Sequence, residues 1–176
     1  MASILKVNTI QDATNSNTAV TINSSGLVAP KKPAFQATLS ANQTVTDNSN
    51  TKINFNTVTF DTSSSFDTSN YRYVAPVAGY YWFSLTLYLA TASVDINRFI
   101  LYIGKNGSIS SPARVHDEDL YDNTQNAYQV RQGGIMYELN GSSDYVEGWT
   151  YIDTVSGDGT INNDHTKFEG FLVSAT

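Results

Sequence analysis

The sequence predicts an all-β protein, and three features of its composition support this fold class. Ser, Thr and Asn supply 56 of the 176 residues, while charged residues make up only 15%. Such a surface is typical of strands and turns, because helical surfaces draw on Glu, Lys, Arg and Gln. The chain also contains 11 Tyr, 8 Phe and 11 Gly but only 2 Met. Hydrophobic residues make up 40%, which is enough for the core of one domain.

Residues 1–32 differ from the rest and predict an extended N-terminal arm that precedes the folded head. The segment has no aromatic residue, and turn-forming Asn, Ser and Gly separate its aliphatic clusters. Residues 18–23 alternate as a short strand does, and Pro30 and Pro33 close the segment. Two interpretations remain open: a disordered tail, or an attachment arm that becomes ordered on a partner. In the second case the aliphatic residues would be its anchors: Ile4, Leu5, Val7, Ile10, Val20 and Ile22.

Residues 33–176 predict a head domain of short strands. Candidate strands are 34–39, 51–60, 70–75, 79–90, 96–104, 127–139, 144–153 and 166–173. Turn signals such as Asn140-Gly141 and Gly157-Asp158-Gly159 separate them. About eight strands at this spacing, without a helical period, predict an antiparallel two-sheet sandwich or jelly roll.

The predicted strand at 79–90 is apolar on both of its faces. One face is a continuous stripe that we expect in the core: Tyr81, Phe83, Leu85, Leu87 and Leu89. The other face carries Tyr80, Trp82 and Tyr88, although a solvated face should be mainly polar. Tyr and Trp are favoured where one surface must be apolar and still form hydrogen bonds, as at subunit interfaces. We predict that these three residues form such an interface; the alternative is that a loop of the same chain covers them.

The segment from Phe66 to Ser84 resembles the signature of the complement-type globular head, which belongs to the tumour-necrosis-factor-like jelly rolls. The matching features are Phe66-Asp67 before a turn, the step Tyr73-Val74-Ala75-Pro76, and Gly79-Tyr80-Tyr81 before Phe83-Ser84. Three flanking segments resemble other strands of that family in the same order: 33–35, 139–146 and 168–173. The resemblance implies a jelly roll of about ten strands that forms a tight homotrimer, with aromatic residues of its inner sheet around the threefold axis.

A second resemblance concerns the N-terminal segment. Residues 3–12 and 21–26 resemble the N-terminal segments of bacteriophage fibre and virion-surface proteins. The first residues show no secretory signal pattern, and the chain has no cysteine. We therefore expect a protein that assembles in the cytoplasm of a host bacterium and is located on the virion surface.

Charge and motif content exclude several other classes of function. The net charge is −6 and no basic cluster exceeds Lys31-Lys32, so nucleic acid is not an expected partner. No apolar run approaches the roughly 18 residues that span a bilayer, so no membrane partner is expected. The sequence contains no nucleophile elbow, phosphate-binding glycine loop or His-x-x-x-His motif. We expect no catalytic, cofactor-binding or metal-binding residues and no cofactor.

The two histidines and one acidic turn are the only candidates for such chemistry. His116 lies in the charge run 114–119, which we expect to be a solvated loop, and we expect no functional site at His165 either. Gly157-Asp158-Gly159, with Asp153 and Asp164, offers oxygen atoms of the kind that bind calcium. A turn explains these glycines, however, and the EF-hand spacing is absent.

Together these observations predict a non-enzymatic, homotrimeric decoration or cement protein of a bacteriophage capsid, anchored to the major capsid protein by its arms. The alternative is the receptor-binding tip of a tail fibre, which would contact a tail protein and recognise a host-surface glycan or protein. The length of the arm favours the first, because 32 residues provide almost no fibre shaft. The fibre-like N-terminal sequence favours the second.

Overall fold

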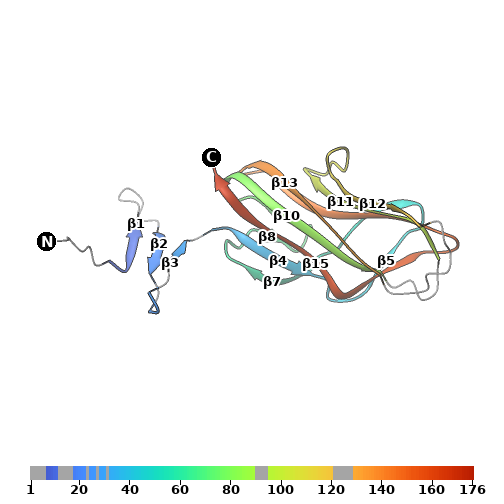
Figure 1. Cartoon of the computed structure of the whole chain (residues 1–176), viewed down its shortest axis with the longest axis horizontal. Helices are drawn as coiled ribbons and strands as arrows, with labels where there is room; N and C mark the ends of the chain where they lie inside the picture. The colour runs from blue at the N-terminus through green and yellow to red at the C-terminus, as the bar shows by residue number, and fades with distance from the viewer. Residues whose placement is uncertain are drawn as a thin grey trace. The chain divides into compact units, whose positions relative to one another are not determined.

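The computed structural model describes residues 7–11, 18–22, 24–26, 28–30, 32–89, 95–120 and 129–176. These residues form fifteen β-strands and no helix. The part of the chain that is described therefore has no helix with the length and apolarity needed to cross a membrane. The chain divides into two compact units, Met1–Lys32 and Pro33–Thr176 (Figure 1).

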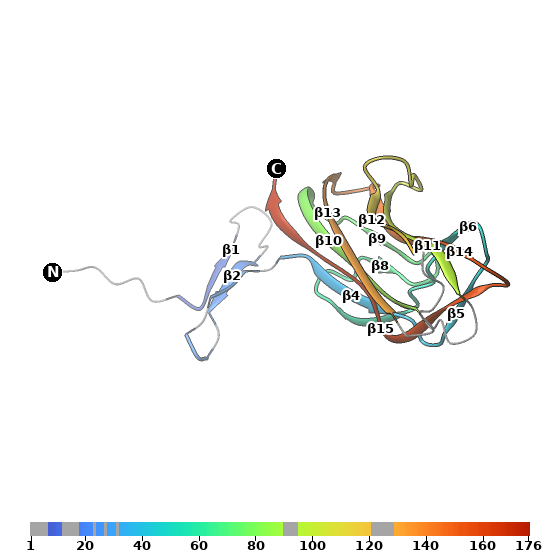
Figure 2. The same ribbon diagram turned by 45° about the vertical axis from the view of Figure 1, so that its right-hand side comes forward.

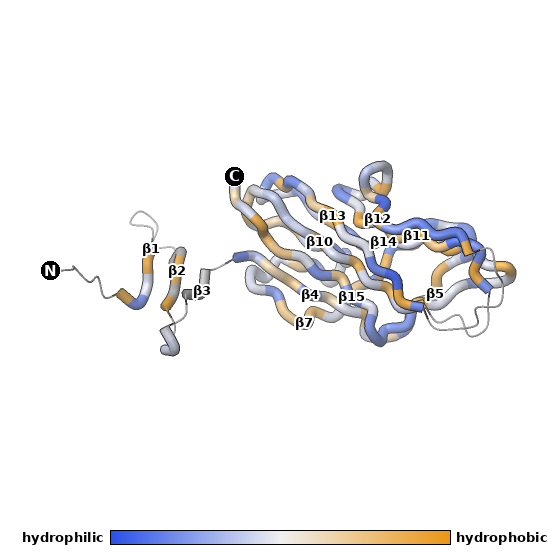
Figure 3. The backbone as a smooth tube through the Cα atoms, in the orientation of Figure 1, coloured by the Kyte–Doolittle hydropathy of each residue, from blue (hydrophilic) through white to orange (hydrophobic). Residues whose placement is uncertain are grey.

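The first unit contains a small antiparallel sheet. Its strands, in spatial order, are β1 (Thr9–Gln11), β2 (Thr18–Ile22) and β3 (Val28–Pro30). The strand predicted at 18–23 is thus confirmed as β2. Ile10 lies opposite Val20 in the register, and Ile22 lies two residues further along β2. Alternate residues of a strand share a face, so Ile10, Val20 and Ile22 form one apolar face of this sheet. Figure 3 colours parts of β1 and β2 as hydrophobic.

The second unit is a sandwich of two antiparallel six-stranded sheets, which confirms the predicted jelly roll. The first, here called the β10 sheet, has the order β13 (Gln129–Asn140), β10 (Ala78–Leu89), β15 (Gly159–Ala175), β4 (Ala34–Thr38) and β7 (Thr57–Asp61), with β5 (Gln43–Val45) paired to β15. The second, the β11 sheet, has the order β12 (Arg114–Asp119), β11 (Ile96–Lys105), β14 (Tyr145–Thr154), β9 (Arg72–Val74) and β8 (Phe66–Asp67), with β6 (Ser49–Lys52) paired to β14. Figure 2 shows β11, β14 and β6 at the right of the sandwich.

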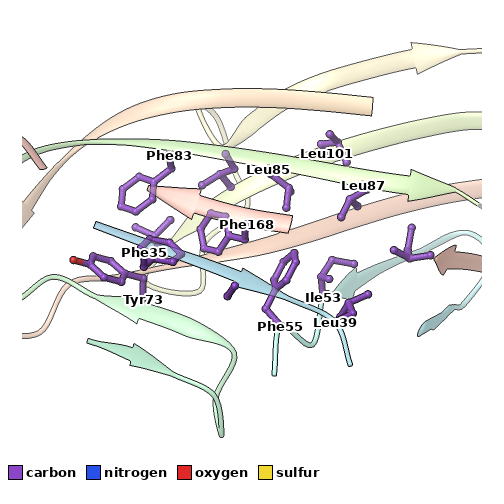
Figure 4. Packing of buried hydrophobic residues seen from close by; sticks show 14 of the residues in the cluster. Phe35, Leu39, Ile53, Phe55, Tyr73, Phe83, Leu85, Leu87, Leu101 and Phe168 are labelled. Atoms are coloured by element: carbon purple, nitrogen blue, oxygen red, sulfur yellow. The ribbon is translucent and has the colours of Figure 1, made fainter. Parts of the chain in front are cut away.

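Aromatic rings fill the space between the two sheets (Figure 4). Phe35 of β4 stacks on Tyr73 of β9 with ring centroids 4.3 Å apart, and meets the edge of Phe168 at 5.2 Å. Phe83 of β10 stacks on Phe168 at 6.0 Å. The predicted core stripe of β10 is confirmed, because none of its five side chains is more than 1% exposed. Close packing also requires Gly170, where a Cβ atom would lie 2.6 Å from Cδ1 of Phe83.

Several strand predictions need correction. Residues 51–60 are not one strand, because the chain crosses from β6 in one sheet to β7 in the other and buries Ile53 and Phe55 on the way. The charge run 114–119 is strand β12 and not a solvated loop, because ion pairs with neighbouring strands stabilise it. The last strand begins at Gly159, where it also pairs with the unpredicted β5, and not at residue 166.

Phe168→Ala should lower the free energy of unfolding by about 3–5 kcal/mol, because it removes the ring that three other core aromatic residues contact. Denaturant unfolding at a fixed protein concentration measures this difference. The matched control is Val155→Ala, at a position that is 53% exposed, where we expect a change below about 0.5 kcal/mol. Equal effects of the two substitutions would contradict the assignment of this core.

Candidate functional site

A row of apolar side chains crosses the outer face of the β10 sheet. The register places Met136 opposite Trp82, Trp82 opposite Phe171, and Phe171 opposite Ala34. Side chains of directly paired residues lie on the same face, so the row runs across β13, β10, β15 and β4. Met136 is 50% exposed, Trp82 38% and Phe171 49%. We call these three large residues the apolar row.

Two further large side chains extend this surface. Tyr80, on the same face of β10 as Trp82, is 42% exposed, and Phe60 of β7 is 46% exposed. A shallow depression of about 260 Å³ lies between Phe60, Trp82 and Phe171. Soluble monomers rarely expose contiguous apolar surface of this kind, and where they do it usually marks an interaction site.

The residues next to the apolar row along the strands are polar and bonded to one another. Gln132 Nε2 donates a hydrogen bond to Ser84 Oγ at 2.9 Å, and Gln36 Nε2 donates to Glu169 Oε2 at 2.8 Å. Lys167 Nζ lies 3.2 Å from the Glu169 carboxylate. An apolar centre beside a hydrogen-bonded polar border is the usual arrangement of a protein–protein interface.

Of the three residues predicted for the subunit interface, Tyr80 and Trp82 lie on this surface and Tyr88 lies near one end of it. Tyr88 is half-buried, and its ring meets that of His165 at a centroid distance of 5.5 Å. Its own chain therefore covers part of Tyr88, whereas Tyr80 and Trp82 remain open to a partner. Their role in a subunit interface stays a prediction.

Sequence reasoning missed Met136, Phe171 and Phe60, which stand beside or near Trp82 only because of strand order and register. The glycine at position 134 of β13 is related to this surface, because it leaves space for a large neighbouring side chain. Gly134 lies opposite Ser84, and a Cβ atom there would come within 2.5 Å of Trp82 Cζ2. The Trp82 indole thus lies against the backbone of β13, and glycine at this position leaves room for it.

The predicted anchor residues of the arm belong to the first unit. Val7 is 36% exposed and Ile10 53% exposed, while Val20 and Ile22 are half-buried. The backbone N–H of Ile22 donates to the carbonyl of Asn8 at 2.9 Å. The other two predicted anchors, Ile4 and Leu5, lie outside the described residues.

The charge run around His116 joins the two sheets at one edge of the sandwich. β12 is the edge strand of the β11 sheet, and β13 is the edge strand of the β10 sheet. We call the junction of β12 and β13 the seam. Across it, Arg131 Nε donates a hydrogen bond to Glu118 Oε2. His116 Nε2 lies 3.5 Å from the same carboxylate oxygen. On the other face of β12, Arg98 donates two hydrogen bonds to the Asp117 carboxylate at 3.0 and 2.8 Å.

The electrostatics of the seam are those of a structural ion pair. Partial burial alone would raise the pKa of Glu118, but the hydrogen bond and positive charge of Arg131 outweigh it, and the pKa is lowered from its ordinary value. An ionised, paired carboxylate is not available as a general acid at neutral pH. Among the described residues, no three His, Asp or Glu side chains converge in a way that could hold a metal ion.

The acidic turn considered for calcium uses its carboxylates within the fold. Asp158 Oδ1 accepts a hydrogen bond from the Asp47 backbone N–H at 3.1 Å. Asp153 Oδ1 accepts one from Asn97 Nδ2 at 3.3 Å. Gly157 adopts a φ of 77° in the bend between β14 and β15, as expected of a turn glycine.

Comparison with known proteins agrees with this architecture. Residues 34–173 match the family model described as "C1q domain". In sequence, the chain is 31% identical over 118 residues to "Uncharacterized protein YqcC" of Bacillus subtilis (strain 168). That match covers 63% of this chain but only 30% of the relative.

Two solved structures show the same fold. The globular domain of zebrafish complement 1qA protein matches with a TM-score of 0.53 and 19% identity, over 82% of this chain and 99% of that one. Murine APRIL matches with a TM-score of 0.54 and 10% identity, over 81% and 100% of the two chains. These matches bear out the predicted complement-type jelly roll and support a trimer-forming globular domain. They do not support the resemblance of residues 3–12 and 21–26 to phage proteins, which stays a prediction.

Glu118→Gln should lower stability at neutral pH by up to about 1 kcal/mol, because it removes a partly exposed ion pair that connects the sheets. The pKa of Glu118 is lowered in the folded state, so its contribution is present above the pKa of an unfolded glutamate. It is lost as the pH falls through the folded value. The difference in urea midpoint between wild type and variant should therefore shrink with acidification. The exposed Asp164→Asn serves as control, and a pH-independent difference would contradict the ion pair.

Proposed function

Because the chain belongs to the C1q domain family, we propose that it is a non-enzymatic structural protein whose head assembles as a homotrimer through the outer face of the β10 sheet. The observation that carries this proposal is the apolar row, in which three large side chains in register are each 38–50% exposed. Tyr80 and Phe60 enlarge the apolar surface on either side.

Energetics favour burial of this surface. Each large apolar side chain removed from water contributes roughly 1.5–3 kcal/mol, and each protomer of a cyclic trimer buries its surface in contacts with two neighbours. In the polar border, Gln132 is hydrogen-bonded to Ser84 and Gln36 to Glu169 within the protomer. This border therefore adds little desolvation cost at the rim of such an interface.

We further propose that the trimer decorates a bacteriophage capsid and that its arms bind the major capsid protein. The apolar face formed by Ile10, Val20 and Ile22 supports an arm that binds a partner, since Ile10 is 53% exposed. Three arms on one trimer would act together, so modest affinity per arm would give tight attachment. On this proposal the protein is assembled in the host bacterial cytoplasm and located on the virion surface.

An alternative location for the same trimer is the tip of a tail fibre, where it would be attached to a tail protein and exposed to a host receptor. The observation that favours it is a pocket on the outer face of the β11 sheet, on the side of the sandwich away from the apolar row.

Trp82→Asp should dissociate the trimer. A charge placed in a desolvated contact costs about 3–5 kcal/mol, which corresponds to about 100-fold weaker association or more. Sedimentation at micromolar concentration should give three times the 19.3 kDa chain mass for wild type and a smaller mass for the variant. Val155→Asp, at an exposed position between β14 and β15, should stay trimeric. A wild-type mass of 19.3 kDa would end the proposal.

Removal of residues 1–32 should leave a head that still folds and forms trimers, because every core residue found in the described part of the chain lies in Pro33–Thr176. Its melting temperature should lie close to that of the full chain. It should fail to bind phage particles assembled without this protein, measured by co-sedimentation. In the full chain, the double substitution Ile10→Asp and Val20→Asp should have the same effect. If the truncated head decorated particles as well as the full chain, the head itself would be the docking surface.

A further inference from the structure

The outer face of the β11 sheet carries a second row of side chains in register. Arg114 of β12 lies opposite Tyr102 of β11, Tyr102 lies opposite Trp149 of β14, and Trp149 lies opposite Lys52 of β6. Two aromatic rings thus stand side by side with a cation at each end. The Arg114 guanidinium carbon is 5.8 Å from the centroid of the Tyr102 ring, and Lys52 Nζ is 6.0 Å from that of Trp149.

A pocket of about 440 Å³ opens at one end of this row. Its polar and aromatic lining consists of Asn50, Tyr102, Ser110, Ser111 and Arg114, with Pro112 at one side. The connection between β11 and β12, which projects as a loop beside those strands in Figure 1, supplies the wall. Backbone hydrogen bonds from Ala113 to Ser110 and from Ile103 to Ala113, both 2.9 Å, hold this wall in place. The pocket is therefore formed before any ligand binds.

The charges around the pocket argue against an anionic ligand. Arg114 Nη1 lies 2.7 Å from Asp117, which also binds Arg98. At the other end of the row, Lys52 is paired with Glu147. Each of these cations already has a carboxylate partner, and the chain as a whole carries a net charge of −6. A phosphate or carboxylate ligand would have to compete with these carboxylates.

We propose that this pocket binds a neutral saccharide. A sugar ring has an apolar face that packs on an aromatic ring and hydroxyl groups that need both donors and acceptors. Tyr102 is only 7% exposed, so it contributes a ring edge, and Ile109 and Pro112 supply the rest of the apolar lining. The Asn50 amide and the hydroxyls of Ser110 and Ser111 supply donors and acceptors. Arg114 has five N–H donors and uses Nη1 for Asp117, so other donors can face a ligand. The volume lies within the roughly 300–1,000 Å³ range of small-molecule sites.

A peptide fits this site less well. The floor of the pocket belongs to β11, whose backbone groups are already paired with β12 and β14 on its two sides. An extended peptide therefore could not add to β11 itself, the strand beneath the pocket.

The proposal goes beyond the structural role of the trimer and does not depend on it, because every lining residue belongs to one protomer. A trimer formed through the β10 sheet would leave all three pockets facing outward. Weak binding at each pocket would then add up to useful avidity for a surface that displays repeated sugars.

The test is saturation-transfer-difference NMR of the full chain with three sugars: methyl α-D-glucopyranoside, methyl β-D-galactopyranoside and N-acetyl-D-glucosamine. A printed array of neutral glycans tests longer ligands. We expect saturation transfer to at least one sugar, or specific binding on the array. Arg114→Ala and Asn50→Ala should each weaken this binding at least about tenfold, with melting temperatures close to that of wild type.

The matched control is Arg72→Ala. Arg72 also packs over a tyrosine, with its guanidinium carbon 4.4 Å from the Tyr145 ring centroid, and pairs with Asp67 at 3.5 Å, but it does not line the pocket. This variant should bind sugar as wild type does. Trp82→Asp should also keep the monosaccharide signal, which separates a failure of the pocket from a failure of the trimer. Absence of binding to every sugar and glycan, equal losses in Arg72→Ala and Arg114→Ala, or a preference for inorganic phosphate or for peptides would overturn the proposal.

Discussion

Strand β10 carries large aromatic or aliphatic side chains on both faces, and much of the structure follows from the need to bury them. The strand is twelve residues long and lies in the middle of its sheet, paired along its length with β13 and β15. The sandwich covers only one face, which carries Phe83 and Leu85 at 0% exposure. The other face leaves Trp82 38% exposed. Ser84 and Thr86 on this face are buried within the protomer, whereas Trp82 is not, and the proposed trimer would cover it.

The core and the exposed face are coupled through register. Phe83 and Phe168 point inward and stack, which requires Trp82 and Phe171 to point outward, because successive residues of a strand alternate between faces. A slip of one residue in β15 would exchange the two sets and bring Phe171 into the core. Gly170, beside Phe83, and Gly134, beside Trp82, remove the side chains that would prevent close packing on either face. The packing of the core therefore also determines the composition of the outer surface.

The sequence was informative where a property belongs to one strand. The alternation in β10 predicted both of its faces, and the turn residues placed most strand ends. What could not be predicted depends on which strands become neighbours. Met136 and Phe171 join Trp82 only through the order β13-β10-β15, which no local pattern encodes. The charge run at 114–119 has the local pattern of a loop, because its partners Arg98 and Arg131 lie in other strands. For the same reason Tyr102 and Trp149, 47 positions apart in the sequence, gave no sign of lying side by side.

Both outer faces of the sandwich carry a row of side chains in register, but one row is apolar and the other includes charged residues. This difference determines which face is better suited to burial in a trimer. The row lies on three strands of the β10 sheet and on four strands of the β11 sheet. On the β10 sheet the row is apolar, and leaving it in water forfeits about 25 cal/mol for each Å². On the β11 sheet the aromatic rings are flanked by Arg114 and Lys52, which are paired with Asp117 and Glu147. Burying those charges would incur a desolvation cost that their mutual attraction scarcely offsets. The same physical chemistry thus favours the β10 face for the proposed contact between protomers and the β11 face for the proposed polar ligand.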